Sequence, residues 1–190
     1  QNEANAFFTS QPFGLSEEQF KAWLKAEGQT LWDEINAQDN LIAFRAGTSG
    51  EKSIGWFNSP VNVPSDLNGL RWRIAGFGSE VARRAGANVI PTAALPRFTE
   101  YATVLKDGTL DALRWSDPYS DWQLDLHTSD AIYYRGPDWS EQSAALAMYI
   151  SLDTYNALPI RLQNAITEAS EATAVAMSAA YELKNAQAIL

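Results

Sequence analysis

The stretch Asp66-Leu-Asn-Gly-Leu-Arg-Trp-Arg-Ile-Ala-Gly76 decides the fold that this sequence predicts. Residues 70–75 alternate large apolar side chains with basic ones, which is typical of a β-strand with Trp72 and Arg73 on opposite faces. The strand runs directly into Gly76-Phe-Gly-Ser-Glu80, which predicts the start of a helix. A guanidinium at the carboxyl end of a strand, beside a helix N-terminus, can hold a carboxylate. Arg73 is therefore a candidate anion-binding residue, and the alternative is an ordinary surface arginine.

The composition is that of an acidic globular protein. The chain has 190 residues, of which 46% are hydrophobic, enough for a sizeable core. Its formal net charge of -9 argues against binding to nucleic acid or an anionic membrane through bulk electrostatics. It has no cysteine and a single histidine, His127, which excludes disulfides, thiolate metal sites and His-rich metal sites.

Strand and helix patterns alternate along most of the chain. Residues 1–39 are predicted to be helical, with Ser16 as an N-cap. Alternating strands and helices predict βαβ units and an open, largely parallel sheet, which binds ligands at the carboxyl ends of its strands. The last residues continue a helical pattern without a cap, so we expect a piece of a longer protein. Residues 41–57 are predicted to be extended, as strands at 41–45 and 53–57 with a turn at 47–50 between them. The other predicted strands lie at 70–75, 88–91, 110–114, 131–134 and 144–150, and the later helices lie at about 79–85, 97–107 and 118–126 and begin near residues 151 and 159.

Motifs for catalysis are weak. Gly76-Phe-Gly-Ser-Glu-Val81 has valine at the third glycine position of a dinucleotide fingerprint, and no Gly-x-Ser-x-Gly elbow is present. His127, which a hydrolytic triad would need, is expected to be a solvated residue at the end of a helix. The acid pair Asp138 and Glu141 is interpreted as loop charge. Three tryptophans near strand ends indicate either an aromatic cleft or core positions: Trp56, Trp115 and Trp139.

Several motifs in one order resemble a known family. They are Gly55-Trp-Phe-Asn-Ser-Pro60, the stretch 66–76, Leu105-Lys-Asp-Gly-Thr-Leu-Asp-Ala-Leu-Arg-Trp115 and Pro118-Tyr-Ser-Asp121. Together they resemble the solute-binding proteins of TRAP (tripartite ATP-independent periplasmic) transporters, closest in pattern to binders of 2-oxo acids and lactate. The resemblance implies an α/β fold of the periplasmic binding protein kind, type II-like, with an open sheet and flanking helices.

The same resemblance implies a domain organisation and partners. Residues 1–40 would be helices of an incomplete first lobe, 41–57 a segment crossing between lobes, 58–150 the α/β ligand-binding lobe, and 151–190 C-terminal helices packing across both lobes. The implied protein is periplasmic, has a signal peptide upstream and delivers its ligand to TRAP membrane permease subunits. Aromatic surface on the long C-terminal helix would, separately, permit a homodimer.

The resemblance also implies roles for individual residues. The arginine that matches Arg73 pairs with the ligand carboxylate in that family. Lys52 and Arg114 stand where the closest members have a glutamine and a glutamate that help to hold a metal ion. Because neither lysine nor arginine is a metal ligand at neutral pH, the expectation is a site without a metal ion or other cofactor. The alternatives are that Lys52 or Arg114 points to solvent, or that Arg114 pairs with Asp117.

The predicted function is therefore binding, and no catalytic residue is expected. The ligand is expected to be an organic acid with one or two carboxylates. The competing functions are a small α/β hydrolase and a ligand-free interaction module of the same fold. The predicted ligand-binding residues are Arg73, Lys52, Arg114, Trp115, Trp56, Trp139, Asp117, Tyr119 and Glu141.

Overall fold

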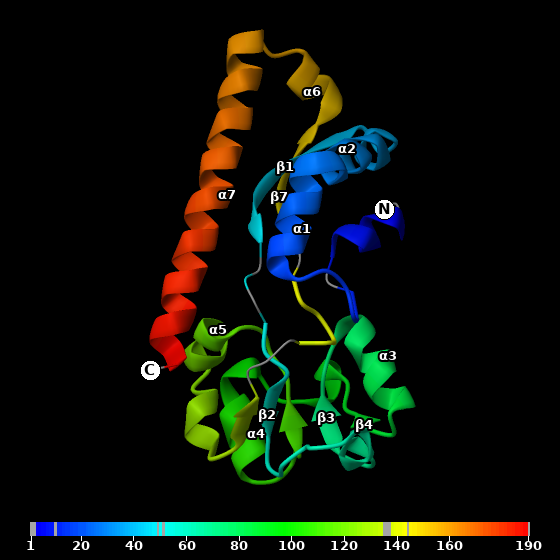
Figure 1. The fold of residues 1–190 in the computed structure, drawn as a ribbon, viewed down its shortest axis with the longest axis vertical. Coiled ribbons are helices and arrows are strands. Elements are labelled where there is room, and N and C mark those ends of the chain that lie inside the picture. The colour runs from blue at the N-terminus through cyan, green and yellow to red at the C-terminus, as the bar shows by residue number, and fades with distance from the viewer. Residues whose placement is uncertain are drawn as a thin grey trace. The chain divides into compact units, whose positions relative to one another are not determined.

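The computed structural model describes residues 3–9, 11–48, 50, 52–134, 138–143 and 145–189, without the side chain of Tyr134. Its contacts divide the chain into two compact units. The first unit comprises residues 1–10, 15–50 and 143–183, and the second comprises 11–14, 51–142 and 184–190. Figure 1 shows the elements of both.

The second unit is built on a five-stranded sheet. Its spatial order is β4-β3-β5-β2-β6. The central strand β5 pairs in parallel with β3 and antiparallel with β2. The strands are β2 (Gly55–Phe57), β3 (Arg71–Arg73), β4 (Asn88–Val89), β5 (Ala112–Leu113) and β6 (Ile132–Tyr134).

Both faces of this sheet are buried against helices. Trp72 and Ile74 pack with Ala82 of helix α3 (Gly76–Arg84) on one face. On the other face, Leu113 packs with Leu105 of α4 (Tyr101–Lys106). Figure 1 shows the two helices beside the labelled strands. The predicted alternation of residues 70–75 is confirmed, because Trp72 lies on the α3 face and Arg73 lies beside Tyr101 of α4.

The prediction of a largely parallel sheet is wrong for half of this sheet. Only the pairs β3–β4 and β3–β5 are parallel, whereas β2 pairs antiparallel with both of its neighbours. The approach of β2 to β5 depends on Gly55, whose φ is +119° and whose added Cβ would lie 2.4 Å from the Leu113 carbonyl oxygen. Only a glycine satisfies both conditions without strain.

The predicted helices of this unit are shorter than their patterns. The helix expected at 97–107 is divided into a 3-10 turn (Phe98–Glu100) and α4. The helix expected at 118–126 ends as α5 (Pro118–Gln123), because Asp125 adopts a left-handed φ of 55°. A 3-10 turn (Leu126–Ser129) follows it, and others occur at Pro64–Leu67 and Thr92–Ala94.

The first unit joins helices to a two-stranded sheet. Strand β1 (Leu41–Thr48) pairs antiparallel with β7 (Ala145–Ser151), with a bulge between Arg45 and Gly47; Ala144 of the predicted 144–150 strand lies outside the described residues. The helical segments are a 3-10 turn (Glu3–Phe8), α1 (Glu17–Trp23), a π-helical turn (Leu24–Gly28), α2 (Gln29–Ala37) and α6 (Leu152–Asn156). Ser16 caps α1, as the sequence predicts, and the structure adds a capping box with Gln19.

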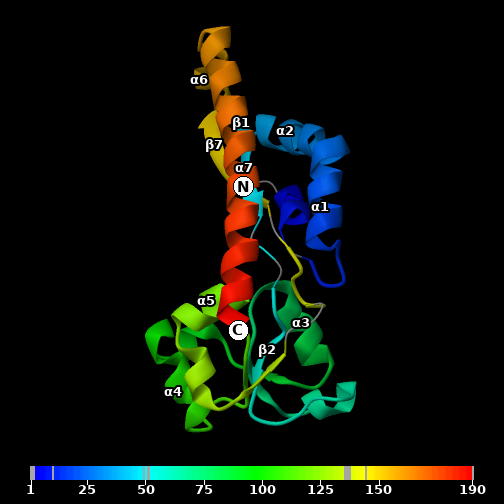
Figure 2. The same cartoon turned by 60° about the vertical axis from the view of Figure 1, so that its left-hand side comes forward.

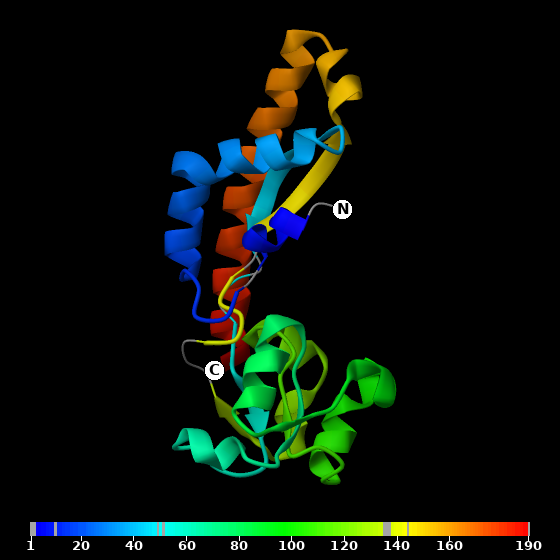
Figure 3. The same ribbon diagram turned by 90° about the vertical axis from the view of Figure 1, so that its right-hand side faces the viewer.

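Two helices cover the β1–β7 sheet of this unit. Trp32 of α2 is buried with Ala43 of β1, and Figure 3 shows α2, in light blue, lying across the two strands. The long helix α7 (Ile160–Ile189) runs beside β1 in Figure 2, and the Ser170 hydroxyl donates to the Arg45 carbonyl. In the described part of the chain, no helix has both the length and the apolar character needed to cross a membrane.

Candidate functional site

Arg73 ends strand β3 as a buried cation without a carboxylate partner among the described residues. Its side chain lies in the second unit, and the residue is only 6% exposed. Nη1 donates to the Arg114 carbonyl, and Nη2 lies 3.4 Å from the Thr92 hydroxyl. Nε is buried and has no hydrogen-bond partner within the described chain. Since buried charges are normally paired, Arg73 is in a state that an anion would stabilise.

Aromatic rings surround the Arg73 guanidinium. Its Cζ lies 5.0 Å from the Trp115 ring centroid and 5.7 Å from that of Tyr101, distances at which cation–π attraction acts. Phe98 stacks on Trp115, with 6.2 Å between centroids. Burial lowers the pKa of Arg73, and Tyr101 opposes this effect. The group stays protonated at neutral pH, because an arginine titrates far above it.

Lys52 and Arg114 are each paired with acids. Arg114 Nε donates to Asp138 Oδ2 at 2.8 Å, and Nη2 donates to the same oxygen. Arg114 Nη1 donates to Glu141 Oε2 at 2.7 Å, and Lys52 Nζ donates to the same Glu141 oxygen at 3.0 Å. The expected alternative of an Arg114–Asp117 pair is wrong. Two cations therefore face two carboxylates in a cluster that we call the paired-charge network: Lys52, Arg114, Asp138 and Glu141.

Glu141 accepts hydrogen bonds from both cations of this network. Burial raises its pKa, but the charges of Arg114 and Lys52 outweigh that effect and leave the pKa below its usual value. Glu141 Oε1 faces the N-terminus of α3, 3.7 Å from the position that a Cβ on Gly76 would take. No side chain caps that helix end, whose amide dipoles favour negative charge. Glu141 is thus an ionised carboxylate held by two cations and a helix N-terminus.

Asp117 and Asp121 belong to a second polar cluster, at the start of α5. Asp117 is the N-cap and accepts from the Ser120 backbone N–H at 3.0 Å. Asp121 accepts from the Trp56 indole N–H at 3.0 Å and from the Ser116 backbone N–H at the same distance. Burial, with a smaller contribution from the Asp117 charge, raises the pKa of Asp121 to about 6.

The remaining predicted residues take structural positions in the second unit. Trp56 is 8% exposed and belongs to the core on the α4 face. Trp139 stacks on Phe13 and meets Trp72 edge-on, at 5.9 and 6.0 Å between centroids. The Tyr119 backbone N–H donates to the Asn185 side chain. These contacts give the core interpretation of Trp56 and Trp139 a direct physical basis.

Three residues around Arg73 and Arg114 were not predicted as site residues from the sequence. Thr92 lies in the 3-10 turn that follows β4, and Tyr101 begins α4. No local sequence pattern predicts a site role for either residue. Asp138 was interpreted as loop charge, but it is 1% exposed and binds Arg114. Its spacing from Glu141 was the available signal. His127, by contrast, is exposed and stacks on Trp122 at 5.5 Å.

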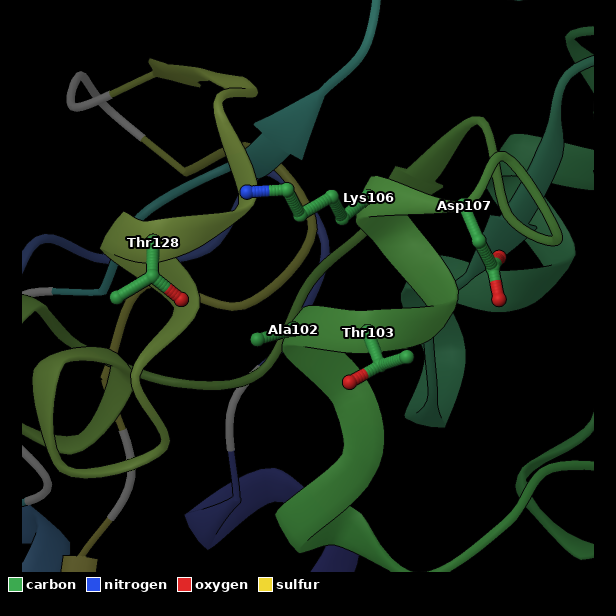
Figure 4. Close-up of a pocket in the computed structure, with 5 residues that line it drawn as sticks. All are labelled: Ala102, Thr103, Lys106, Asp107 and Thr128. Atoms are coloured by element: carbon green, nitrogen blue, oxygen red, sulfur yellow. The ribbon is translucent and has the colours of Figure 1, made fainter.

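Two hollows have linings that do not include Arg73. The first has a volume of about 340 Å³ and lies between α4 and the 126–129 turn; Figure 4 shows its five lining residues, among them Lys106. Lys106 pairs with Asp130 at 3.2 Å. The second, of about 470 Å³, lies in the first unit between α1, β1 and α7. Its Lys21 and Arg45 pair with Glu17 and Glu171. Neither hollow offers a buried unpaired cation within the described chain.

Comparison with known proteins identifies relatives along almost the whole chain. The family described as bacterial extracellular solute-binding protein, family 7, matches residues 2–189. A monocarboxylate 2-oxoacid-binding periplasmic protein of Nostoc sp. strain PCC 7120 is 36% identical over 187 residues, which are 98% of this chain and 50% of that protein. The chain therefore spans about half the length of this curated relative.

Solved structures give the same result. A TRAP periplasmic solute-binding protein of Colwellia psychrerythraea, with bound calcium and pyruvate, aligns with a TM-score of 0.81 and 32% identity over 99% of this chain and 56% of that one. A TRAP transporter solute-binding protein of Bordetella bronchiseptica aligns with a TM-score of 0.78 and 31% identity over 99% and 55%. It is a mixed-occupancy dimer with calcium and picolinate in one site. The predicted periplasmic-binding-protein fold is confirmed.

The prediction of a site without a metal ion is contradicted by these relatives. Both structures hold calcium together with an organic acid. Among the described residues, no group of three histidine, cysteine, aspartate or glutamate residues could hold an ion. The facing oxygens of Asp138 and Glu141 already accept hydrogen bonds from Arg114 and Lys52. We therefore assign no described residue to a metal ion.

Proposed function

The chain belongs to family 7 of the bacterial extracellular solute-binding proteins, and on this premise we propose that it is part of a protein that captures a small organic acid for a TRAP-type transporter. The family is one of binding proteins, so we propose no reaction and no catalytic residue. The proposed location is the periplasm, as in the curated relative.

Arg73 is the observation that supports this function best. Its buried guanidinium has no carboxylate partner in the described chain, and its Nε lacks an acceptor. A ligand carboxylate would supply both the missing charge and the missing acceptor in a planar arrangement that arginine favours. The rings of Trp115 and Tyr101 fix the direction of the guanidinium before the ligand arrives. Pre-ordering of this kind lowers the entropic cost of binding.

The charge count supports a ligand with one carboxylate. Lys52 and Arg114 contribute two positive charges to the paired-charge network, and Asp138 and Glu141 contribute two negative charges. Among the described residues beside this network, Arg73 is then a buried cation without a paired carboxylate. We propose a monocarboxylate, as bound by the curated relative and, in the form of pyruvate, by the Colwellia protein.

The proposed domain organisation and partners follow from the family resemblance, with the residue ranges given in the sequence analysis. Residues 58–150 are proposed as the α/β ligand-binding lobe, preceded by helices of an incomplete first lobe at 1–40 and the crossing segment at 41–57. Residues 151–190 are proposed as the C-terminal helices. TRAP permease subunits are the proposed membrane partner, and a homodimer is proposed with the Bordetella dimer as its precedent.

A thermal-shift screen of the natural full-length protein tests the proposal. Pyruvate, lactate and succinate are each added with calcium and, separately, with a chelator, since relatives hold calcium with their ligands. A monocarboxylate at a hundred times its Kd should stabilise the folded protein by about 2.7 kcal/mol through mass action. Absence of any shift with all three acids in calcium would favour the ligand-free interaction module. Hydrolysis of simple esters by the purified protein would favour the hydrolase.

A further inference from the structure

A second group of anion-binding donors lies beside Arg73, and the Glu141 side chain of the same chain occupies it. Lys52 Nζ and Arg114 Nη1 converge on one oxygen, Glu141 Oε2, at 3.0 and 2.7 Å. The other carboxylate oxygen of Glu141 faces the uncapped N-terminus of α3. Two cationic donors and a helix N-terminus are the elements of an anion site. Here their occupant is a side chain of the protein itself.

This position acts electrically on Arg73. The Arg73 side chain donates to the Arg114 carbonyl, so the two arginines are consecutive members of one hydrogen-bonded chain. The charges of both Arg114 and Glu141 act on the Arg73 guanidinium. A ligand held by Arg73 therefore meets the field of the paired-charge network, and the sign of that field depends on Glu141.

Glu141 and Asp138 differ in how firmly they are held. Asp138 has a fully buried side chain and also accepts from the Ser140 backbone N–H at 2.8 Å, so it is part of the fold. The Glu141 side chain is 28% exposed, and in the described chain its carboxylate accepts hydrogen bonds from the two cations. Removing the charge of Glu141 leaves the Arg114–Asp138 pair intact and leaves Lys52 uncompensated.

We propose that Glu141 is a specificity-determining residue that excludes dicarboxylates by occupying, as an internal carboxylate, the anion position formed by Lys52, Arg114 and the start of α3. The inference rests on the proposed function and deepens it. A ligand with a second carboxylate has to displace Glu141 or lie beside it, and two like charges at one position repel each other. A monocarboxylate uses Arg73 alone and is not affected in this way.

The test measures affinities of the full-length protein and its Glu141→Gln variant by calorimetry, in calcium-containing buffer. Glutamine keeps the shape and the acceptor oxygen but removes the charge. We expect affinity for oxaloacetate or 2-oxoglutarate to rise at least about tenfold, which is about 1.4 kcal/mol, while affinity for pyruvate changes less than about threefold. Adding Lys52→Gln to Glu141→Gln should abolish the gain.

Two controls separate the possible outcomes. Glu80→Gln removes one charge from exposed α3 pairs with Arg83 and Arg84 and should leave dicarboxylate binding unchanged. Glu141→Ser, which also leaves room for an incoming carboxylate, is measured alongside, and a cooperative thermal transition verifies that each variant is folded. Wild-type protein that binds pyruvate, with no gain for dicarboxylates in either Glu141 variant, would overturn the inference alone. Wild-type protein that binds no organic acid would instead overturn the proposed function.

Discussion

Asp121 shows how burial changes the chemistry of a single residue. It is 1% exposed and accepts hydrogen bonds from Trp56 and Ser116, yet no cation pairs with it in the described chain. Its pKa of about 6 lies above the ordinary 3.8. The folded protein therefore takes up a proton at this group at a higher pH than the unfolded chain does. Stability contributed by this protonation rises as the pH falls from about 7 to about 4.

The Asp121→Asn variant isolates that contribution. Asparagine keeps an acceptor for Trp56 but does not titrate. The free energy of unfolding of the variant should therefore lack the contribution from protonation of Asp121. Because each pKa unit corresponds to about 1.4 kcal/mol and the unfolded group is already partly protonated at pH 4, the wild type should gain about 2.4 kcal/mol on the variant between pH 7 and pH 4. Urea unfolding of both proteins at pH 7, 6, 5 and 4 measures the difference. A difference that stays constant over this range would show that Asp121 is ionised throughout.

The network of Lys52, Arg114, Asp138 and Glu141 shows the limit of prediction for single residues. Lys52, Arg114 and Glu141 were predicted as ligand-binding residues, the first two from the positions that they occupy in the family resemblance. The sequence could not show that the charges of the network cancel, since the partners are 24 to 89 positions apart. The pairing depends on how β2 and β5 are brought together, which no local pattern records.

At the scale of elements, the contact between β2 and β5 positions Arg114. Gly55 begins β2 with a φ of +119°, and an added Cβ would lie 2.4 Å from the Leu113 carbonyl oxygen and 2.9 Å from the Arg114 Cα. Gly69 also has a positive φ, +75°, but nothing lies within 4 Å of its added Cβ. Comparing Gly55 with Gly69 therefore distinguishes the cost of backbone strain from the cost of a steric clash.

Alanine substitutions at these glycines should therefore differ. Gly69→Ala should cost about 1 kcal/mol of unfolding free energy, because only the left-handed conformation is penalised. Gly55→Ala should cost at least about twice as much, because the strands must also separate. Chemical denaturation of both variants measures the two costs. Equal costs would mean that β2 and β5 can move apart freely, which contradicts the close approach at Gly55.

Element boundaries were predicted where chemistry is local. The Ser16 N-cap depends on neighbouring residues, and the structure confirms it. Strand β3 lies inside the predicted 70–75, and α3 begins at Gly76, ahead of the helix predicted at about 79–85. The direction of β2 was not predicted, because alternation fixes which face a side chain occupies and not which strand lies beside it. Helix α5 is shorter than predicted because Asp125 adopts a left-handed conformation, and the helical pattern of residues 118–126 does not indicate this conformation.

At the scale of the whole molecule, family resemblance and physical reasoning contributed different things. The order of motifs correctly indicated the family, which matches residues 2–189. The metal-free expectation came from two substituted positions, Lys52 and Arg114, and the calcium-holding relatives contradict it. Substitutions at these two positions do not define a whole site, particularly when the chain spans about half the length of its relatives.

The central claim is that Arg73 binds the carboxylate of the ligand, and calorimetry with pyruvate tests it most directly. The full-length protein is compared with Arg73→Gln and with Arg71→Gln, which removes an arginine of the same strand that pairs with Asp111 at 2.6 Å. Loss of two charge-assisted hydrogen bonds should weaken binding by Arg73→Gln at least about 100-fold. Arg71→Gln should bind within about threefold of the wild type. A folded Arg73→Gln protein with wild-type affinity for pyruvate would contradict the account.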